Sequence, residues 1–220
     1  MKLEAASERE LLAQKARSFF EERWREGDPW EVEQSDLDQA SYGRQLALLE
    51  GERYGSVLEL GCGAGSFTQR LADLADRVLA LDIAPSAIER ARERGIRPEV
   101  VDFRAANIMD FDVRAEGPWD LIVMSETIYY LGWLYSMFDI GWLAAELFAA
   151  TREGGSFLMA NTYGAEKDHL LCPWLIDTYR DLFLNVGFRL QAEETVRGTK
   201  FGVAYEILVT LLSKPREVTG

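Results

Sequence analysis

The sequence predicts an α/β protein built on a doubly wound, mostly parallel sheet of seven strands. Short apolar runs alternate with helical patterns along most of the chain, a rhythm that is typical of parallel sheets covered by helices on both faces. A glycine-rich turn follows the first apolar run. The last two apolar runs are separated by turn residues, which predicts a closing pair in which the last strand is antiparallel.

Two helices are expected before the sheet begins. Residues 1–26 carry apolar side chains at helical spacing among charges, and Gly27-Asp28-Pro29 ends that pattern. A second helical pattern covers Leu37 to Leu49. We therefore divide the chain into an N-terminal helical lid or extension, residues 1–50, and a main domain, residues 51–220.

Seven strands and four helices are expected in the main domain. The strands cover residues 57–60, 77–82, 100–104, 121–124, 156–160, 188–195 and 204–213. One helix follows the glycine-rich turn, one starts near Pro85, and two more span 135–151 and 174–185. Gly154-Gly155 is expected as a loop before the fifth strand, and Arg197 to Lys200 as the turn between the last two strands.

Charge and composition exclude several classes of partner. The chain has 24 basic and 37 acidic residues, a net charge of −13, so it should repel phosphate backbones and anionic lipid. Its two cysteines are too few for a disulfide framework or a structural zinc site, and no carboxylate spacing indicates a metal. No apolar stretch approaches the ~20 residues of a membrane span, and no signal peptide is recognised. We expect a cytoplasmic monomer or homodimer that acts on a small molecule, without nucleic-acid or membrane partners.

The glycine-rich turn predicts a site for a nucleotide-like ligand. Gly61, Gly63 and Gly65 let the backbone approach a ligand closely and bend sharply into the next helix. A dinucleotide-binding turn would have a third glycine where this chain has Ser66. Glu59, two residues before the turn, would repel a pyrophosphate but attract a ligand that carries an ammonium and a sulfonium.

The stretch from Leu58 to Gly65 resembles the first motif of the class I S-adenosylmethionine-dependent methyltransferases, and the match extends over about residues 57–160. The resemblance implies a Rossmann-like fold with S-adenosyl-L-methionine as cofactor and S-adenosyl-L-homocysteine as product. It also implies that Asp82, at the end of the second strand, accepts both ribose hydroxyls, with Ile83 beside it. A role of Asp82 in capping the next helix is the alternative.

The same resemblance implies an adenine site after the third strand. The family usually has an acidic residue there, and this chain has Asn107, whose amide oxygen can accept a hydrogen bond from the adenine amino group. The backbone N–H of Ile108 could meet a ring nitrogen, and Asp110 is the alternative acidic residue. Ser125, at the end of the fourth strand, is assigned to the same cofactor site.

Several further stretches are similar to the NodS-type methyltransferases. They are Asp28-Pro29-Trp30, Tyr42, Leu58 to Thr68, Glu126 to Leu131 and Tyr205 to Leu208. NodS methylates the amine of a deacylated chitooligosaccharide, but related sequences are expected in varied natural-product pathways, so the acceptor stays open. The resemblance implies that Trp30 and Tyr42 lie on a lid over the cofactor. Packing of the N-terminal helix onto the core is the alternative for both.

The acceptor pocket is expected beyond the fourth and fifth strands, because ligands of open parallel sheets bind at the carboxyl ends of the strands. The segments 125–132 and 161–174 follow these strands. Their acidic, aromatic and histidine side chains are Glu126, Tyr129, Tyr130, Tyr163, Asp168, His169 and Trp174. Such a lining suits a sugar, an amine or an aryl acceptor.

Three of these residues are candidates for catalysis. His169 is the only histidine and would titrate near neutral pH; the alternative is a solvated loop residue. Glu126 follows an apolar strand and could act as a base or anchor a cationic amine, with capping of the next helix as the alternative. Tyr129 is the third candidate, although a tyrosine that titrates near ~10 suits the wall of a pocket better.

These observations predict a methyltransferase that moves a methyl group from S-adenosylmethionine to a nitrogen or oxygen of a small molecule by in-line displacement. A nicotinamide-dependent oxidoreductase is one alternative, which Glu59 and Ser66 disfavour. A non-catalytic cofactor-binding subunit is the other, and the intact glycine turn disfavours it.

Overall fold

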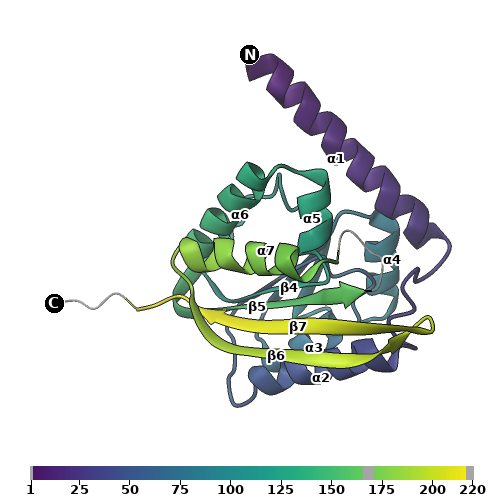
Figure 1. Cartoon of the computed structure of the whole chain (residues 1–220), viewed down its shortest axis with the longest axis vertical. Helices are drawn as coiled ribbons and strands as arrows, with labels where there is room; N and C mark the ends of the chain where they lie inside the picture. The colour runs from purple at the N-terminus through teal and green to yellow at the C-terminus, as the bar shows by residue number, and fades with distance from the viewer. Residues whose placement is uncertain (1, 166–170, 217–220) are drawn as a thin grey trace.

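One seven-stranded sheet organises the protein (Figure 1). The computed structural model describes residues 2–165 and 171–216. In chain order the strands are β1 (Val57–Leu60), β2 (Val78–Asp82), β3 (Val101–Ala105), β4 (Trp119–Ser125), β5 (Thr151–Ala165), β6 (Arg189–Lys200) and β7 (Val203–Ser213). Across the sheet their order is β3-β2-β1-β4-β5-β7-β6.

The strand directions confirm the predicted fold class. Strand β1 pairs in parallel with β2 and β4, β3 pairs with β2, and β5 pairs with β4. The last strand, β7, is antiparallel to both of its neighbours, β5 and β6. The strand order reverses between β1 and β4, and the crevice at such a reversal is where ligands of open α/β sheets bind.

Helices cover both faces of the sheet. They are α1 (Lys2–Arg25), α2 (Asp36–Leu48), α3 (Thr68–Leu74), α4 (Pro85–Glu93), α5 (Ile128–Leu134), α6 (Met137–Ala150) and α7 (Pro173–Asn185). Helices α5, α6 and α7 lie on one face, and α2 and α3 lie on the other (Figure 1). Side chains of β1 alternate between the two apolar clusters, so Leu58 and Leu60 face the α5–α7 layer. None of the described helices has both the length and the apolar character needed to cross a membrane.

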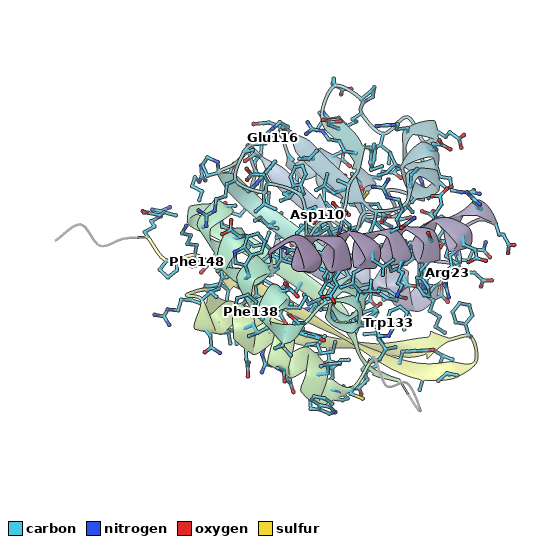
Figure 2. All side chains as sticks on the ribbon, turned by 90° about the horizontal axis from the view of Figure 1, so that it is seen from above. Arg23, Asp110, Glu116, Trp133, Phe138 and Phe148 are labelled. Carbon is cyan, nitrogen blue, oxygen red and sulfur yellow. The ribbon has the colours of Figure 1, made fainter. Side chains whose placement is uncertain are left out.

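Helix α1 crosses over the body of the protein, and its N-terminal end extends away from it (Figures 1 and 2). Near its C-terminal end Trp24 is buried against Ala84 and Ala87 at the start of α4. On another side Phe19 meets Trp133 of α5 edge-on, with ring centroids 5.2 Å apart. The C-terminal half of α1 therefore contacts both α4 and α5.

The helix predicted over 135–151 is confirmed as α6, and it is preceded by a further helix, α5, that the sequence did not predict. Helix α5 ends at Leu134, Tyr135 is extended, and α6 begins at Met137. The hydroxyl of Ser136 accepts a hydrogen bond from the N–H of Asp139 (3.2 Å), and the Asp139 carboxylate accepts one from the N–H of Ser136 (3.1 Å). This reciprocal capping box starts a new helix within a continuous apolar pattern, which is why the pattern alone did not reveal the break.

The turn predicted at Arg197 to Lys200 is wrong, because β6 continues through these residues. The chain reverses at Phe201 and Gly202, with φ values of 52° and 74°. A two-residue hairpin turn of type I′ has left-handed backbone at both positions, which glycine adopts without strain. Gly198 lies instead where Leu37 of α2 packs on β6, since a Cβ there would be 3.0 Å from the Leu37 side chain.

The glycine pair expected as a loop before the fifth strand lies inside β5. Gly154 and Gly155 fall within Thr151–Ala165, where the register with β4 shifts between Trp119 and Leu121. A shift of this kind allows extra residues in one strand without ending its pairing. The fifth strand is therefore longer at both ends than the predicted 156–160.

The substitution Ser136→Ala should destabilise the fold, because it removes the side chain that caps α6. We expect the free energy of unfolding to fall by about 1 kcal/mol, measured by urea denaturation followed by circular dichroism. Ser136→Asp, which preserves a capping oxygen, should retain most of the stability. Equal stability of Ser136→Ala and the wild type would contradict this account of the break between α5 and α6.

Candidate active site

A cavity of about 340 Å³ lies at the carboxyl ends of β1, β2 and β4. Residues predicted for the cofactor and for catalysis both line it. They are Trp30, Tyr42, Glu59, Gly61, Gly63, Asp82, Ile83, Asn107, Ile108, Ser125, Glu126 and Tyr129. The two groups of residues therefore face one shared space at the point where the strand order reverses.

The glycine turn is fitted closely between its neighbours. Gly61 and Gly63 have φ values of 81° and 53°, in the left-handed region that favours glycine. A Cβ at Gly61 would lie 2.2 Å from Oγ1 of Thr127, and a Cβ at Gly63 would lie 2.9 Å from the ring of Trp24. A side chain at either position would displace the start of α5 or the end of α1.

Asp82 fixes the shape of this turn. Its Oδ2 accepts a hydrogen bond from the N–H of Gly63, and its Oδ1 accepts one from the N–H of Ala84, both at 2.9 Å. Ala84 precedes α4, so Asp82 holds the start of that helix while it also lines the cavity. Burial raises the pKa of Asp82 to about 6, although the backbone hydrogen bonds act in the opposite direction.

Glu59 is a buried acid in the middle of the sheet, with 3% of its surface exposed. Its Oε2 accepts a 2.5 Å hydrogen bond from the hydroxyl of Thr68 at the start of α3. Burial, together with the nearby charge of Asp82, raises the pKa of Glu59 to about 8, and no basic side chain of the described residues acts against this. A buried carboxylate is unfavourable unless it is paired, so this position favours a cationic ligand.

The N-terminal segment covers the cavity with aromatic side chains. The indole N–H of Trp30 donates a hydrogen bond to the hydroxyl of Tyr130 (3.1 Å). Tyr42 of α2 stacks on Phe67, with ring centroids 4.9 Å apart. Trp30 and Tyr42 thus pack the N-terminal segment onto the main domain and line the cavity at the same time.

The segment after β3 is held by a local network. The side-chain amide of Asn107 donates to the hydroxyl of Tyr135 (2.9 Å) and to the carboxylate of Asp110 (2.7 Å), and its oxygen accepts from the N–H of Met109 (3.2 Å). Asn107 and Tyr135 line the cavity, whereas Asp110 is exposed. Tyr135 was not recognised from the sequence, because the predicted helix over 135–151 concealed it.

Glu126 is held in a left-handed backbone conformation, with φ 52°. Its Oε2 accepts hydrogen bonds from the hydroxyls of Tyr129 (2.8 Å) and Thr162 (2.6 Å), while its buried Oε1 has no hydrogen-bond partner in the described chain. Burial raises the pKa of Glu126 to about 7, and the two hydroxyls act against that rise. The residue at the N-cap of α5 is Thr127, so the alternative of Glu126 as a helix cap is wrong.

Glu126 belongs to a polar wall of the cavity. We use this name for Asp38, Ser41, Glu126, Tyr129, Thr162 and Lys200, which all line the cavity. Asp38 and Ser41 project from α2, and Lys200, the last residue of β6, forms an ion pair with Asp38. The sequence analysis missed Asp38, Ser41, Thr162 and Lys200, because they come from three elements that are distant along the chain.

Other predicted residues lie away from the cavity. A Cβ at Gly65 would meet Ile96, Phe103 and Ala91, so this glycine serves the packing of α4. Two residues expected in the acceptor pocket point elsewhere, since Tyr163 donates to the Asp177 carboxylate (3.0 Å) and Trp174 is 67% exposed. His169 and Asp168 lie outside the described residues. Across residues 2–165 and 171–216, no group of three or more His, Cys, Asp or Glu side chains is arranged to hold a metal ion.

A family model described as Nodulation protein S (NodS) matches residues 13–139, which is more than half of the chain. The chain belongs to the NodS family. The match covers the C-terminal half of α1, all of α2, the glycine turn and the segment that carries Glu126, and it confirms the resemblance seen in the sequence.

Two NodS proteins illustrate the degree of similarity. Nodulation protein S of Bradyrhizobium diazoefficiens is 32% identical over 152 residues, which are 67% of this chain and 66% of that protein. Nodulation protein S of Rhizobium tropici is 34% identical over 106 residues, which are 48% of this chain and 44% of that protein. The matches thus span about half to two thirds of the length of these NodS relatives.

A solved NodS structure shares the fold. The crystal structure of the N-methyltransferase NodS from Bradyrhizobium japonicum WM9, in complex with S-adenosyl-L-homocysteine, matches with a TM-score of 0.77 at 22% sequence identity. The superposition covers 91% of this chain and 99% of that chain. The fold found here is therefore that of NodS.

The substitution Glu59→Gln should stabilise the protein, and more so as the pH rises. Glu59 ionises near 4.5 in the unfolded chain but near 8 in the fold, so the folded protein keeps a proton that the unfolded chain has lost, and its stability falls as the pH rises through this window. Glutamine removes the charge and still accepts the bond from Thr68. We expect a gain on the order of 3 kcal/mol at pH 9 and little difference at pH 5, measured by urea unfolding. The exposed Glu50→Gln variant is the control, and a gain independent of pH would contradict this reading of Glu59.

Proposed function

We propose that this protein is an S-adenosylmethionine-dependent methyltransferase that methylates the nitrogen of a small-molecule amine. The observation that carries the proposal is Glu59, a buried carboxylate beside the glycine turn that no cation compensates in the described chain. Membership of the NodS family supports it, as does the N-methyltransferase activity named for the NodS protein with the same fold.

The residues around the glycine turn fit S-adenosylmethionine. The carboxylates of Glu59 and Asp82 would attract its cationic amino-acid portion and accept hydrogen bonds from its hydroxyl groups. Trp30 and Tyr42 would cover it with aromatic surface, and Asn107 and Ile108 would border the adenine. When bound, the cofactor supplies a methyl group that is attached to a sulfonium sulfur. The sulfur keeps the electron pair of the broken S–C bond and becomes the neutral thioether of S-adenosylhomocysteine.

Glu126 would serve as the base on the acceptor side. A protonated amine has no free electron pair, so its nitrogen must lose a proton before a new N–C bond can form. The unpartnered Oε1 of Glu126 would accept this proton. The pKa of Glu126 is about 7, close to the value that suits a base at neutral pH. Tyr129 and Thr162 hold the other oxygen and thereby orient the carboxylate.

The charges favour a small amine over the other ligand classes. Glu59, Asp82 and Glu126 would repel the diphosphate of a nicotinamide cofactor. The net charge of −13 likewise disfavours nucleic acid. A neutral alcohol would gain little from the acidic lining, whereas an ammonium gains an electrostatic partner before it is deprotonated.

Isothermal titration calorimetry with S-adenosylhomocysteine tests the cofactor. We expect the wild type to bind, and we expect Asp82→Ala to lose about 10-fold to 100-fold in affinity, because it removes the carboxylate that holds the turn and faces the ligand. Asp102→Ala, at an exposed acid on β3, should bind like the wild type. No binding by the wild type, or binding of NADH in its place, would refute the proposed function.

The substitution Glu126→Gln should lower kcat for amine acceptors by about 10²-fold to 10⁴-fold at pH 7.5. Its affinity for S-adenosylhomocysteine should change little. The defect should shrink as the pH approaches the pKa of the amine, because the acceptor then loses its proton without a base. In the wild type, kcat/KM should fall as the pH drops below about 7. The measurement is methyl transfer to a panel of aminosugars, amines and matched alcohols, and full activity of the variant at pH 7.5 would remove Glu126 from the mechanism.

A further inference from the structure

The inner face of α2 is polar where an amphipathic helix usually buries apolar side chains. Asp38, Ser41 and Gln45 follow one another at helical spacing, and all three are buried. The amide N–H groups of Gln45 donate to the hydroxyls of Ser41 (3.2 Å) and Ser125 (3.3 Å), while its Oε1 has no hydrogen-bond partner in the described chain. Buried polar groups are unfavourable without partners, so this face requires an explanation other than stability.

The ion pair between Asp38 and Lys200 is largely buried. Only 11% of the Asp38 side chain and 15% of the Lys200 side chain are exposed. The pair joins α2 to the end of β6, directly before the tight turn at Phe201 and Gly202. Replacing such a pair by apolar residues is often neutral or stabilising, so the fold alone does not account for it.

The two charges of this pair act on Glu126 in opposite directions. Asp38 raises the pKa of Glu126, and Lys200 lowers it. The other titratable groups that face Glu126 within the described chain are Tyr42 of α2 and Tyr129 of α5, and burial raises the pKa of both hydroxyls, so they stay neutral. With the ion pair intact, the polar wall therefore carries the charge of Glu126 and no other net charge.

We propose that the Asp38–Lys200 ion pair sets the charge of the polar wall, so that the wall recognises its acceptor in the singly cationic ammonium form. This inference rests on the proposed function. Glu126 attracts one ammonium group and then takes one proton from it, which leaves a neutral amine and a neutral carboxylic acid. Without Asp38, Lys200 would cancel the charge of Glu126; without Lys200, two carboxylates would repel each other. Asp38 and Lys200 are thus positioning residues that act through Glu126.

The test compares Asp38→Asn, Lys200→Gln and the double variant by the titration of the Glu126 carboxyl carbon in ¹³C NMR. The Glu126→Gln variant assigns the signal, and no acceptor is needed. We expect the midpoint to move down by about 1 pH unit in Asp38→Asn and up by about 1 pH unit in Lys200→Gln. The double variant should return close to the wild type. A purely structural pair would not shift the midpoint in opposite directions.

A matched control exists between the same two elements. Arg44 of α2 and Glu194 of β6 form an exposed ion pair, with 51% and 33% of their side chains exposed. Arg44→Gln should leave the Glu126 midpoint unchanged. Shifts of the same sign in Asp38→Asn and Lys200→Gln, or no shift in either, would overturn the inference. If Lys200→Gln does not fold, the downward shift in Asp38→Asn and its reversal in the double variant decide the question.

The proposed function is tested by measurements other than the NMR titration. Calorimetry with S-adenosylhomocysteine reports the cofactor site, and methyl transfer to the amine panel reports the reaction. Opposite shifts of Glu126 would support the charge-setting role even if no methyl transfer occurred. For amines that are methylated, kcat/KM plotted against pH should move in the same directions as the NMR midpoint. Methylation by the wild type without any shift in the variants would refute this inference and leave the proposed function standing.

Discussion

The carboxylate of Asp82 joins the two turns on which the whole site depends. One oxygen holds the amide of Gly63 after β1, and the other holds the amide of Ala84 before α4. Because β1 and β2 are adjacent parallel strands, their turns emerge at the same edge of the sheet, and one short side chain sets the distance between them. The glycine turn also packs on Thr127, the residue next to Glu126. The glycine turn and the segment that carries Glu126 are therefore held against each other.

The site concentrates acidic groups that the fold does not neutralise. Glu59, Asp82 and Glu126 all have raised pKa values, and burial is the largest cause for each. Such groups lower the stability of the protein at neutral and alkaline pH. A cationic ligand would recover that loss by pairing with them, which links binding to stability. Sites that are poorly stabilised in the absence of ligand are a recurrent feature of functional surfaces.

The strands of the sheet could be predicted from the sequence because the signals for them are local. Each parallel strand contains apolar residues close together in the sequence, and the order of turns and helices leaves few alternatives for the topology. The glycine turn and Asp82 were found because they follow directly on strands. Signals that depend on a few polar residues were missed: the Ser136–Asp139 capping box within an apolar stretch, and the left-handed turn at Phe201 and Gly202. The polar wall could not be foreseen, because Asp38, Glu126 and Lys200 meet only through the tertiary fold.

The reversal at Phe201 and Gly202 uses two residues, the minimum for a hairpin. Lys200 and Tyr205, on either side of this reversal, both line the cavity. Since β6 and β7 are paired up to Lys200 and Val203, an insertion in the reversal would change the type of turn and with it the placement of Lys200. Diversification of acceptor choice at this rim would therefore proceed by exchange of side chains rather than by growth of the loop.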